Sequence, residues 1–195
     1  FDRLFQEIKN GLKKCKEIGK IPVSMGVDTW GVDFVLMDKD DKVLGNTVGY
    51  RDHRNEGMDE EVYKTISLED LYARTGIQKA IFNTVYQLMA VKTKHPEYLE
   101  QAETMLHVPD YFHYLLTGKK TCEYTEATTG QLVNAETKDW DYELIDKLGY
   151  PRKMFQKLIM PGTSVGHFTE EVKAEVGFDV EVVAPDTHDT GSAVL

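Results

Sequence analysis

The sequence has little of several features that mark large classes of proteins. It has 2 cysteines, Cys15 and Cys122, which are too few and too far apart for a disulfide framework or a four-ligand zinc site. Its apolar runs are far shorter than the roughly 20 residues that cross a bilayer, and residues 1–20 lack the apolar core of a signal peptide. We therefore expect a cytoplasmic protein with reduced thiols and no contact with a membrane.

Positive charge is also scarce. Lysine and arginine number 23 against 33 aspartates and glutamates, which gives a formal net charge of -10 at pH 7. An acidic chain without a local basic stripe repels the phosphate backbone of nucleic acids. Nucleic acid is therefore not expected as a partner.

Familiar catalytic motifs are missing as well. The sequence has no G-x-x-x-x-G-K-[S/T] phosphate loop, no G-x-G-x-x-G fingerprint, no H-E-x-x-H zinc motif and no G-x-S-x-G elbow. His107, His113 and His167 have no partners at the sequence spacing of metal ligands, so no metal site is predicted.

What the sequence does contain is a mixture of helical and strand patterns. Apolar spacing and end signals predict helices over 4–15, 56–66, 68–74, 84–91, 109–117, 141–148 and 169–176. Strand patterns cover 21–27, 32–37 and 180–183, with a hairpin that ends near residue 44, and the Thr- and Gly-rich stretch 122–133 predicts irregular backbone. The 195 residues are therefore expected to form one α/β or α+β domain around a single core.

One candidate site lies where the last strand runs into A-P-D-T-H-D and a new helix. The end of a strand that feeds the start of a helix is where open α/β sheets bind ligands. Asp189 would lie at the N-terminus of that helix, where free amide groups and the helix dipole favour an ionised carboxylate. The alternative is that Asp189 only caps the helix and that His188 is a loop residue without a role.

A second candidate site is the stretch 26–34, which reads G-V-D-T-W-G-V-D-F. Gly26 and Gly31 allow a sharp turn and the close approach of a ligand. A sugar suits this turn, because Trp30 can stack on the C–H face of a sugar ring while Asp28 or Asp33 accepts hydroxyl hydrogen bonds. The alternatives are that Trp30 belongs to the core and that Asp33 faces solvent. The cluster 50–54, Y-R-D-H-R, could likewise bind hydroxyls or phosphate, or form a solvated loop.

Several segments in order resemble the rhamnulokinases of the FGGY family of carbohydrate kinases. They are residues 26–36, 50–52, 75–78, 82–88, 109–112, 116–118, 123–125, 131–134 and 188–190. The resemblance implies ATP-dependent phosphorylation of L-rhamnulose at its 1-hydroxyl, with magnesium. It implies that Asp189 is the catalytic base and that Gly31, His188 and Thr190 contact the sugar, to which we add Trp30 and Asp33 on chemical grounds.

The resemblance also implies an α/β fold of the actin-like ATPase and ribonuclease H-like type. Residues 1–195 correspond to the N-terminal sugar-binding domain, and we expect it to be a fragment that lacks the first strands and the C-terminal ATP-binding domain. Such a fragment is expected to be inactive alone. Other FGGY kinases, acting on xylulose, fuculose, ribulose or glycerol, remain the alternative, as does a sugar-binding module without catalysis. A purely structural role comes third, and the oligomeric state is left open.

Overall fold

Two apolar clusters organise the computed structural model, which describes residues 1–194. The larger cluster surrounds an antiparallel pair of strands, β2 (Phe34–Met37) and β3 (Thr104–His107), in which Phe34 faces His107. Every residue of both strands is buried. Helix α4 (Thr84–Lys94) buries all residues from Thr84 to Val91, so its sequence is apolar on most of its surface.

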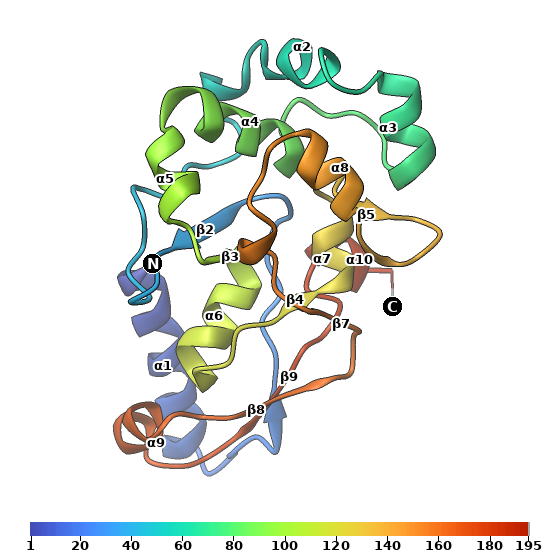
Figure 1. The fold of residues 1–195 in the computed structure, drawn as a ribbon. Coiled ribbons are helices and arrows are strands. Elements are labelled where there is room, and N and C mark those ends of the chain that lie inside the picture. Colours follow the sequence, from blue (N-terminus) through green and yellow to red (C-terminus); the bar gives the residue numbers. More distant parts are fainter. Residues whose placement is uncertain (195) are drawn as a thin grey trace.

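The smaller cluster lies under a three-stranded sheet with the order β1-β9-β8. Strand β1 (Ser24–Met25) runs parallel to β9 (Glu181–Val183), and β8 (Ser164–His167) pairs with β9 in the antiparallel sense. Helices α1 (Asp2–Glu17) and α9 (Glu170–Val176) lie side by side at this end of the molecule (Figure 1).

The remaining elements complete the fold, and several of them add residues to the larger cluster (Figure 1). Strand β4 (Cys122–Glu123) pairs with β7 (Leu158–Ile159), and β5 (Val133–Asn134) pairs with β6 (Asp139–Trp140). The other α-helices are α2 (Met58–Tyr63), α3 (Leu68–Thr75), α5 (Pro96–Gln101), α6 (Val108–Thr117), α7 (Tyr124–Thr128), α8 (Tyr142–Lys147) and α10 (Asp189–Ser192). Two 3₁₀ helices cover His53–Asn55 and Arg152–Met154.

Local signals predicted most helix ends. The Asp70 amide donates to Ser67 Oγ at 3.0 Å, which caps α3 as the sequence predicts. Gly76, Gly118 and Gly177 end their helices in the left-handed region, with φ of 66°, 71° and 83°. These residues confirm the predicted ends because capping depends on a few neighbouring residues only.

Three local predictions were wrong or incomplete. The stretch predicted as irregular, 122–133, contains β4 and α7. Strand β3 was not predicted, although it is the main partner of β2, and the predicted hairpin is reduced to a bridge between Met37 and Val43. The mixture of helices and strands confirms the expected α/β class.

In residues 1–194, no helix combines the length and the apolar character that crossing a membrane requires.

Candidate functional site

The two stretches proposed from the sequence lie next to each other. The Thr29 amide donates to the Thr187 carbonyl at 3.0 Å, and the Asp189 amide donates to the Thr29 carbonyl at 2.9 Å. A Cβ atom at Gly26 would lie 2.6 Å from the Val183 carbonyl oxygen, so only glycine permits this approach. The turn 26–34 and the turn that holds Asp189 therefore form one unit.

A cavity of about 510 Å³ opens between these turns and the segment that precedes α4. The turns contribute six of the residues that line it: Trp30, Gly31, Val32, His188, Asp189 and Thr190. The other residues that line it include Tyr50, Phe82, Asn83 and Thr129. Five of the six candidate site residues thus line one cavity, and the sixth, Asp33, lies outside its lining.

Gly31 is a second point of close approach between the two turns. A Cβ atom there would lie 3.2 Å from His188 Cδ2 and 3.2 Å from Thr129 Cγ2. Both distances are shorter than ordinary van der Waals contacts between carbon atoms. The absence of a side chain at Gly31 thus permits the imidazole of His188 to lie close to the backbone of this turn.

Val32 adopts a backbone conformation that is rare for a β-branched residue, with φ of 71°. Its amide donates to Glu126 Oε1 at 3.0 Å, and its carbonyl accepts from Thr84 Oγ1 at 2.8 Å and from Gln87 Nε2 at 3.2 Å. Strained backbone persists where the surroundings hold it, and it concentrates at functional sites. Three buried side chains therefore hold the turn beside Gly31 in place.

Asp33 lies behind Trp30. It is 2% exposed, and its Oδ2 accepts from Trp30 Nε1 at 2.8 Å and from the Tyr50 amide at 3.2 Å, while Oδ1 accepts from Gln87 Nε2 at 3.0 Å. Burial raises the pKa of Asp33, and the hydrogen bonds from Trp30 and Gln87 oppose that rise. Asp33 thus does not face solvent, and Trp30, which is 40% exposed, is not a core residue.

Two carboxyl groups of the β4–α7 segment connect both turns. Glu123 Oε2 accepts from the Thr187 amide at 3.2 Å and from Thr187 Oγ1 at 2.8 Å, and Glu126 holds Val32 as described. Both glutamates are 0% exposed. Burial raises the pKa of Glu126 well above its ordinary value, and the charges of Asp110 and Glu123 contribute to the rise.

The sequence reasoning missed these glutamates as functional residues because it assigned them to irregular backbone. In the structure, Glu123 Oε1 accepts from the Thr125 amide at 2.8 Å, so Glu123 acts as the N-cap of α7. Glutamate is not among the residues that are favoured at N-caps, so the sequence carries no clear signal for this role. Nothing in the sequence indicates that its other oxygen contacts Thr187.

The residues of the cluster 50–54 have two kinds of role: Tyr50 lines the cavity, whereas Asp52 and Arg54 make hydrogen bonds behind it. Tyr50 lines the cavity and meets Phe82 edge to face, with ring centroids 5.3 Å apart. Arg54 Nη2 donates to Gln87 Oε1 at 2.9 Å, so Arg54 points toward the buried hydrogen bonds of Gln87 and Asp33. Asp52 Oδ1 accepts from the Arg54 amide at 2.7 Å and caps the short 3₁₀ helix.

The exposed groups of the cavity suit a small polar ligand with apolar faces. Trp30 and Phe82 offer rings, and Asp189 and Thr190 offer a carboxylate and a hydroxyl. Asp189 is the one lining residue with a carboxylate, and its side chain is 55% exposed. In the described part of the chain, no lysine or arginine lines this cavity, so its chemistry fits a neutral polyol better than a highly charged anion.

Comparison with known proteins agrees with this chemistry. Residues 1–195 match the FGGY family of carbohydrate kinases, N-terminal domain. The chain is 57% identical to a rhamnulokinase of Halalkalibacterium halodurans and 51% identical to one of Oceanobacillus iheyensis, in each case over 194 residues. These alignments cover 100% of this chain but only 42% and 41% of the two relatives. The chain thus spans about two fifths of their length.

Solved structures share the fold. A ligand-bound xylulose kinase from Lactobacillus acidophilus superposes with a TM-score of 0.85 at 21% identity, over 95% of this chain and 39% of that chain. A carbohydrate kinase from Novosphingobium aromaticivorans gives a TM-score of 0.83 at 20% identity, over 99% of this chain and 41% of that chain. The family match extends from one end of the sequence to the other, and on that ground the chain belongs to the FGGY family of carbohydrate kinases.

Proposed function

We propose that these residues form the sugar-binding part of an enzyme that transfers the γ-phosphoryl group of ATP to the 1-hydroxyl of L-rhamnulose. One observation carries the proposal: the turns that hold Trp30 and Asp189 line one cavity of about 510 Å³. The name of the relatives, rhamnulokinase, at 57% and 51% identity supports the choice of sugar. We assign the activity to the whole protein, because this chain corresponds to about two fifths of the length of its rhamnulokinase relatives.

Asp189 is the proposed base. Its carboxylate accepts the proton of the 1-hydroxyl while the sugar oxygen forms a bond to the γ-phosphorus, and ADP leaves with the electrons of the broken bond. Thr190 Oγ1 donates to Asp189 Oδ1 at 3.2 Å, which leaves the second carboxylate oxygen for the sugar. Phosphoryl transfer through a loose transition state needs orientation of the nucleophile more than strong activation.

The other candidate residues receive separate roles. Trp30 stacks on the sugar ring, while His188 and Thr190 donate or accept hydroxyl hydrogen bonds and Gly31 permits close approach. Asp33 acts through Trp30, because the hydrogen bond from Trp30 Nε1 fixes the orientation of the indole ring. Asp33 is therefore proposed as a positioning residue and not as a direct sugar contact.

The residues around the cavity do not fit a triphosphate, because no lysine or arginine among residues 1–194 lines it. We propose that residues 1–195 are the sugar-binding domain and that another part of the whole protein binds ATP and magnesium. Magnesium, when bound with ATP, would neutralise phosphate charge. No residue of this chain is assigned to that role.

Other sugars provide the main alternative, because the solved structures that share the fold include xylulose, gluconate and glycerol kinases. A panel of ketoses and glycerol, assayed by sugar-dependent ADP release with the full-length protein, tests the choice. We expect kcat/KM for L-rhamnulose to exceed that for xylulose, fuculose and ribulose by about tenfold or more, which equals roughly 1.4 kcal/mol of discrimination. Equal or higher values for another sugar would reject L-rhamnulose as the substrate.

A sugar-binding module without catalysis is the second alternative. It predicts calorimetric binding of the sugar to the full-length protein with no ADP release for any member of the panel. We also expect residues 1–195 alone to release no ADP, because their cavity offers no group for the phosphates. Rhamnulose-dependent ADP release by these residues alone would contradict the proposed division between the sugar and nucleotide sites.

A further inference from the structure

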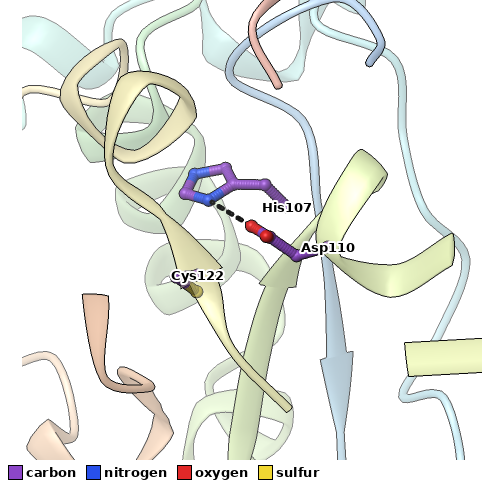
Figure 2. A group of neighbouring side chains, drawn as sticks. All are labelled: His107, Asp110 and Cys122. Atoms are coloured by element: carbon purple, nitrogen blue, oxygen red, sulfur yellow. Dashed lines mark ion pairs between the residues drawn. The ribbon is translucent and has the colours of Figure 1, made fainter. Parts of the chain in front are cut away.

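Three buried side chains of the types that bind metal ions lie close together at β4. His107 ends β3, Asp110 lies in the first turn of α6 and Cys122 belongs to β4 (Figure 2). All three are 0% exposed. Their donor atoms lie within 4.8 Å of one another, and His107 Nδ1 is 4.0 Å from Asp110 Oδ2. In the described part of the chain, this is the one group of three such side chains found so close together.

Several donor atoms of this group have no hydrogen-bond partner among residues 1–194. They are both ring nitrogens of His107 and Asp110 Oδ2. Asp110 Oδ1 is occupied by the Glu123 amide at 3.0 Å, and the Cys122 thiol has only the Met105 carbonyl at 3.6 Å. Buried polar atoms are almost always partnered, so this concentration of unpartnered atoms needs an explanation.

Without a cation, the group is also electrostatically unfavourable in its charged forms. Burial raises the pKa of Asp110 and of the Cys122 thiol well above their ordinary values, and it lowers the pKa of His107 to about 4. A bound divalent cation reverses this situation, because it stabilises a carboxylate and a thiolate and accepts the lone pair of a neutral imidazole.

We propose that His107, Asp110 and Cys122 bind one zinc ion in a structural site. Nitrogen, oxygen and sulfur donors together suit zinc, and one carboxylate with one thiolate balances its charge. Zinc bond lengths of roughly 2.0–2.3 Å place tetrahedral donors about 3.3–3.8 Å apart. Side-chain rotations that shorten the present separations by about 1 Å therefore complete the site.

Glu126 lies outside this group, because its carboxylate oxygens are not within 4.8 Å of all three donor atoms. Its Oε2 is buried and unpartnered among the described residues, and its Oε1 accepts from the Val32 amide at 3.0 Å. A fourth donor from Glu126 would therefore need a further movement of this side chain, whereas a water molecule would complete a four-coordinate site without one.

The position of the group gives the ion a structural role. It lies where the β3–α6 junction meets β4. Strand β4 contains Glu123 and is followed by α7, which contains Glu126, and these two glutamates hold the two turns of the cavity. Sequence spacing does not reveal the group, because Cys122 comes from a different strand. Zinc binding is independent of the proposed sugar and of the proposed reaction, so each proposal can fail without the other.

Metal content of the full-length protein provides the first test. The protein is produced in zinc-supplemented medium, passed over a chelating resin, and measured by inductively coupled plasma mass spectrometry. We expect about one zinc per chain, released only when the protein is unfolded. Less than one tenth of a zinc per chain, together with no uptake on refolding in zinc, would show a metal-free polar cluster and overturn the proposal.

Cobalt substitution identifies the ligands. Refolding in Co²⁺ should produce a thiolate-to-cobalt charge-transfer band in the near ultraviolet. Cys122→Ser should abolish this band and the bound metal, whereas Cys15→Ser, a change at the other cysteine on α1, should retain both. If Cys122→Ser does not fold, His107→Gln and Asp110→Asn replace it, and each should lower the zinc content of the full-length protein by about tenfold or more. An unchanged zinc content in both variants would overturn the assignment. Loss of the band in Cys15→Ser, or its retention in Cys122→Ser, would overturn the assignment.

Discussion

The two ends of the molecule bury different kinds of side chain. Beneath the cavity, polar side chains are 2% exposed or less: Asp33, Gln87, Asp110, Glu123 and Glu126. The cluster under α1 and α9 is built from apolar residues such as Leu12, Val176 and Val182. Its charges stay at the surface, where Glu175 pairs with Lys9 and Lys13 at 2.5 and 2.8 Å.

This difference has a physical cause. A buried carboxyl group is unfavourable unless its oxygens accept hydrogen bonds, so it persists where those bonds hold a backbone that would otherwise relax. Val32 is such a backbone, because its φ of 71° is held by contacts from Glu126, Thr84 and Gln87. The α1–α9 end needs only packing. Changes at the cavity end should therefore affect turnover, and changes at the other end should affect stability alone.

The largest effect is expected at the cavity, from Asp189→Asn in the full-length protein. The amide cannot accept the hydroxyl proton, so kcat should fall by about 10³-fold, within the usual range for loss of a general base, with KM little changed. Steady-state ADP release measures both constants. Asp186→Asn, in the same loop but outside the residues that line the cavity, is the matched control and should retain the wild-type kcat. Equal losses in the two variants would argue against a base at Asp189.

The next effect concerns the pH dependence of stability where α6 joins the two ends, because Val27 packs against the α1–α9 cluster. His113 Nε2 accepts from the Val27 amide at 3.0 Å, and burial lowers the pKa of His113 from 6.5 to about 4. A lowered pKa means that the folded state binds fewer protons than the unfolded state between pH 6.5 and 4. The free energy of unfolding therefore decreases as the pH is lowered through that window. At pH 5 this one group lowers it by about 2 kcal/mol relative to neutral pH.

Urea unfolding of His113→Gln at pH 7.5 and pH 5 measures this effect. The variant should lose about 2 kcal/mol less than the wild type between the two pH values, because glutamine does not titrate. The exposed residue His95 supplies the control, and His95→Gln should keep the wild-type pH dependence. If His113→Gln follows the wild-type curve, the neutral imidazole is not the cause.

A smaller effect is expected where the two turns meet. In Gly31→Ala, the new methyl group would lie 3.2 Å from His188 Cδ2 and displace the imidazole. We expect KM for the sugar to rise by about tenfold, or roughly 1.4 kcal/mol, with a smaller change in kcat. Gly191→Ala is the control, because a Cβ atom there meets nothing within 4 Å. Unchanged KM in both variants would show that His188 does not depend on the space at Gly31.

The smallest effect is expected at the α1–α9 end, from Glu175→Gln. Hydrogen bonds from Lys13, Lys9 and Gln6 lower the pKa of Glu175 to about 2. The contribution of Glu175 to stability is therefore fully present above pH 4.5 and is lost as the pH falls toward 2. Exposed ion pairs contribute about 1 kcal/mol or less, and salt screens them. Urea unfolding at pH 7 should show that Glu175→Gln lowers the free energy of unfolding by this amount at low salt and by less at 1 M salt. The kcat of the variant should equal that of the wild type. A change in kcat would contradict the separation of the two ends.

Local sequence was sufficient for the elements whose ends depend on neighbouring residues. Ser67 and Gly76 delimit α3 as predicted, because a cap and a left-handed glycine act within one turn of helix. The stretch 26–34 and Asp189 were proposed as candidate sites from short motifs, and residues of both line one cavity. The pairing of β2 with β3 and the helix α7 were not, because their stability depends on contacts far away in the sequence.

The candidate site shows the same division. The residue types that suit a sugar, Trp30 and His188 among them, follow from the sequence, as does their order along the chain. That Asp33 supports Trp30 from behind, and that Glu123 and Glu126 hold the two turns, required the structure. The physical reason is that a short motif records only neighbours along the chain. The buried contacts of Glu126 with Val32 and of Glu123 with Thr187 join residues 94 and 64 positions apart, and only the packed fold brings them together.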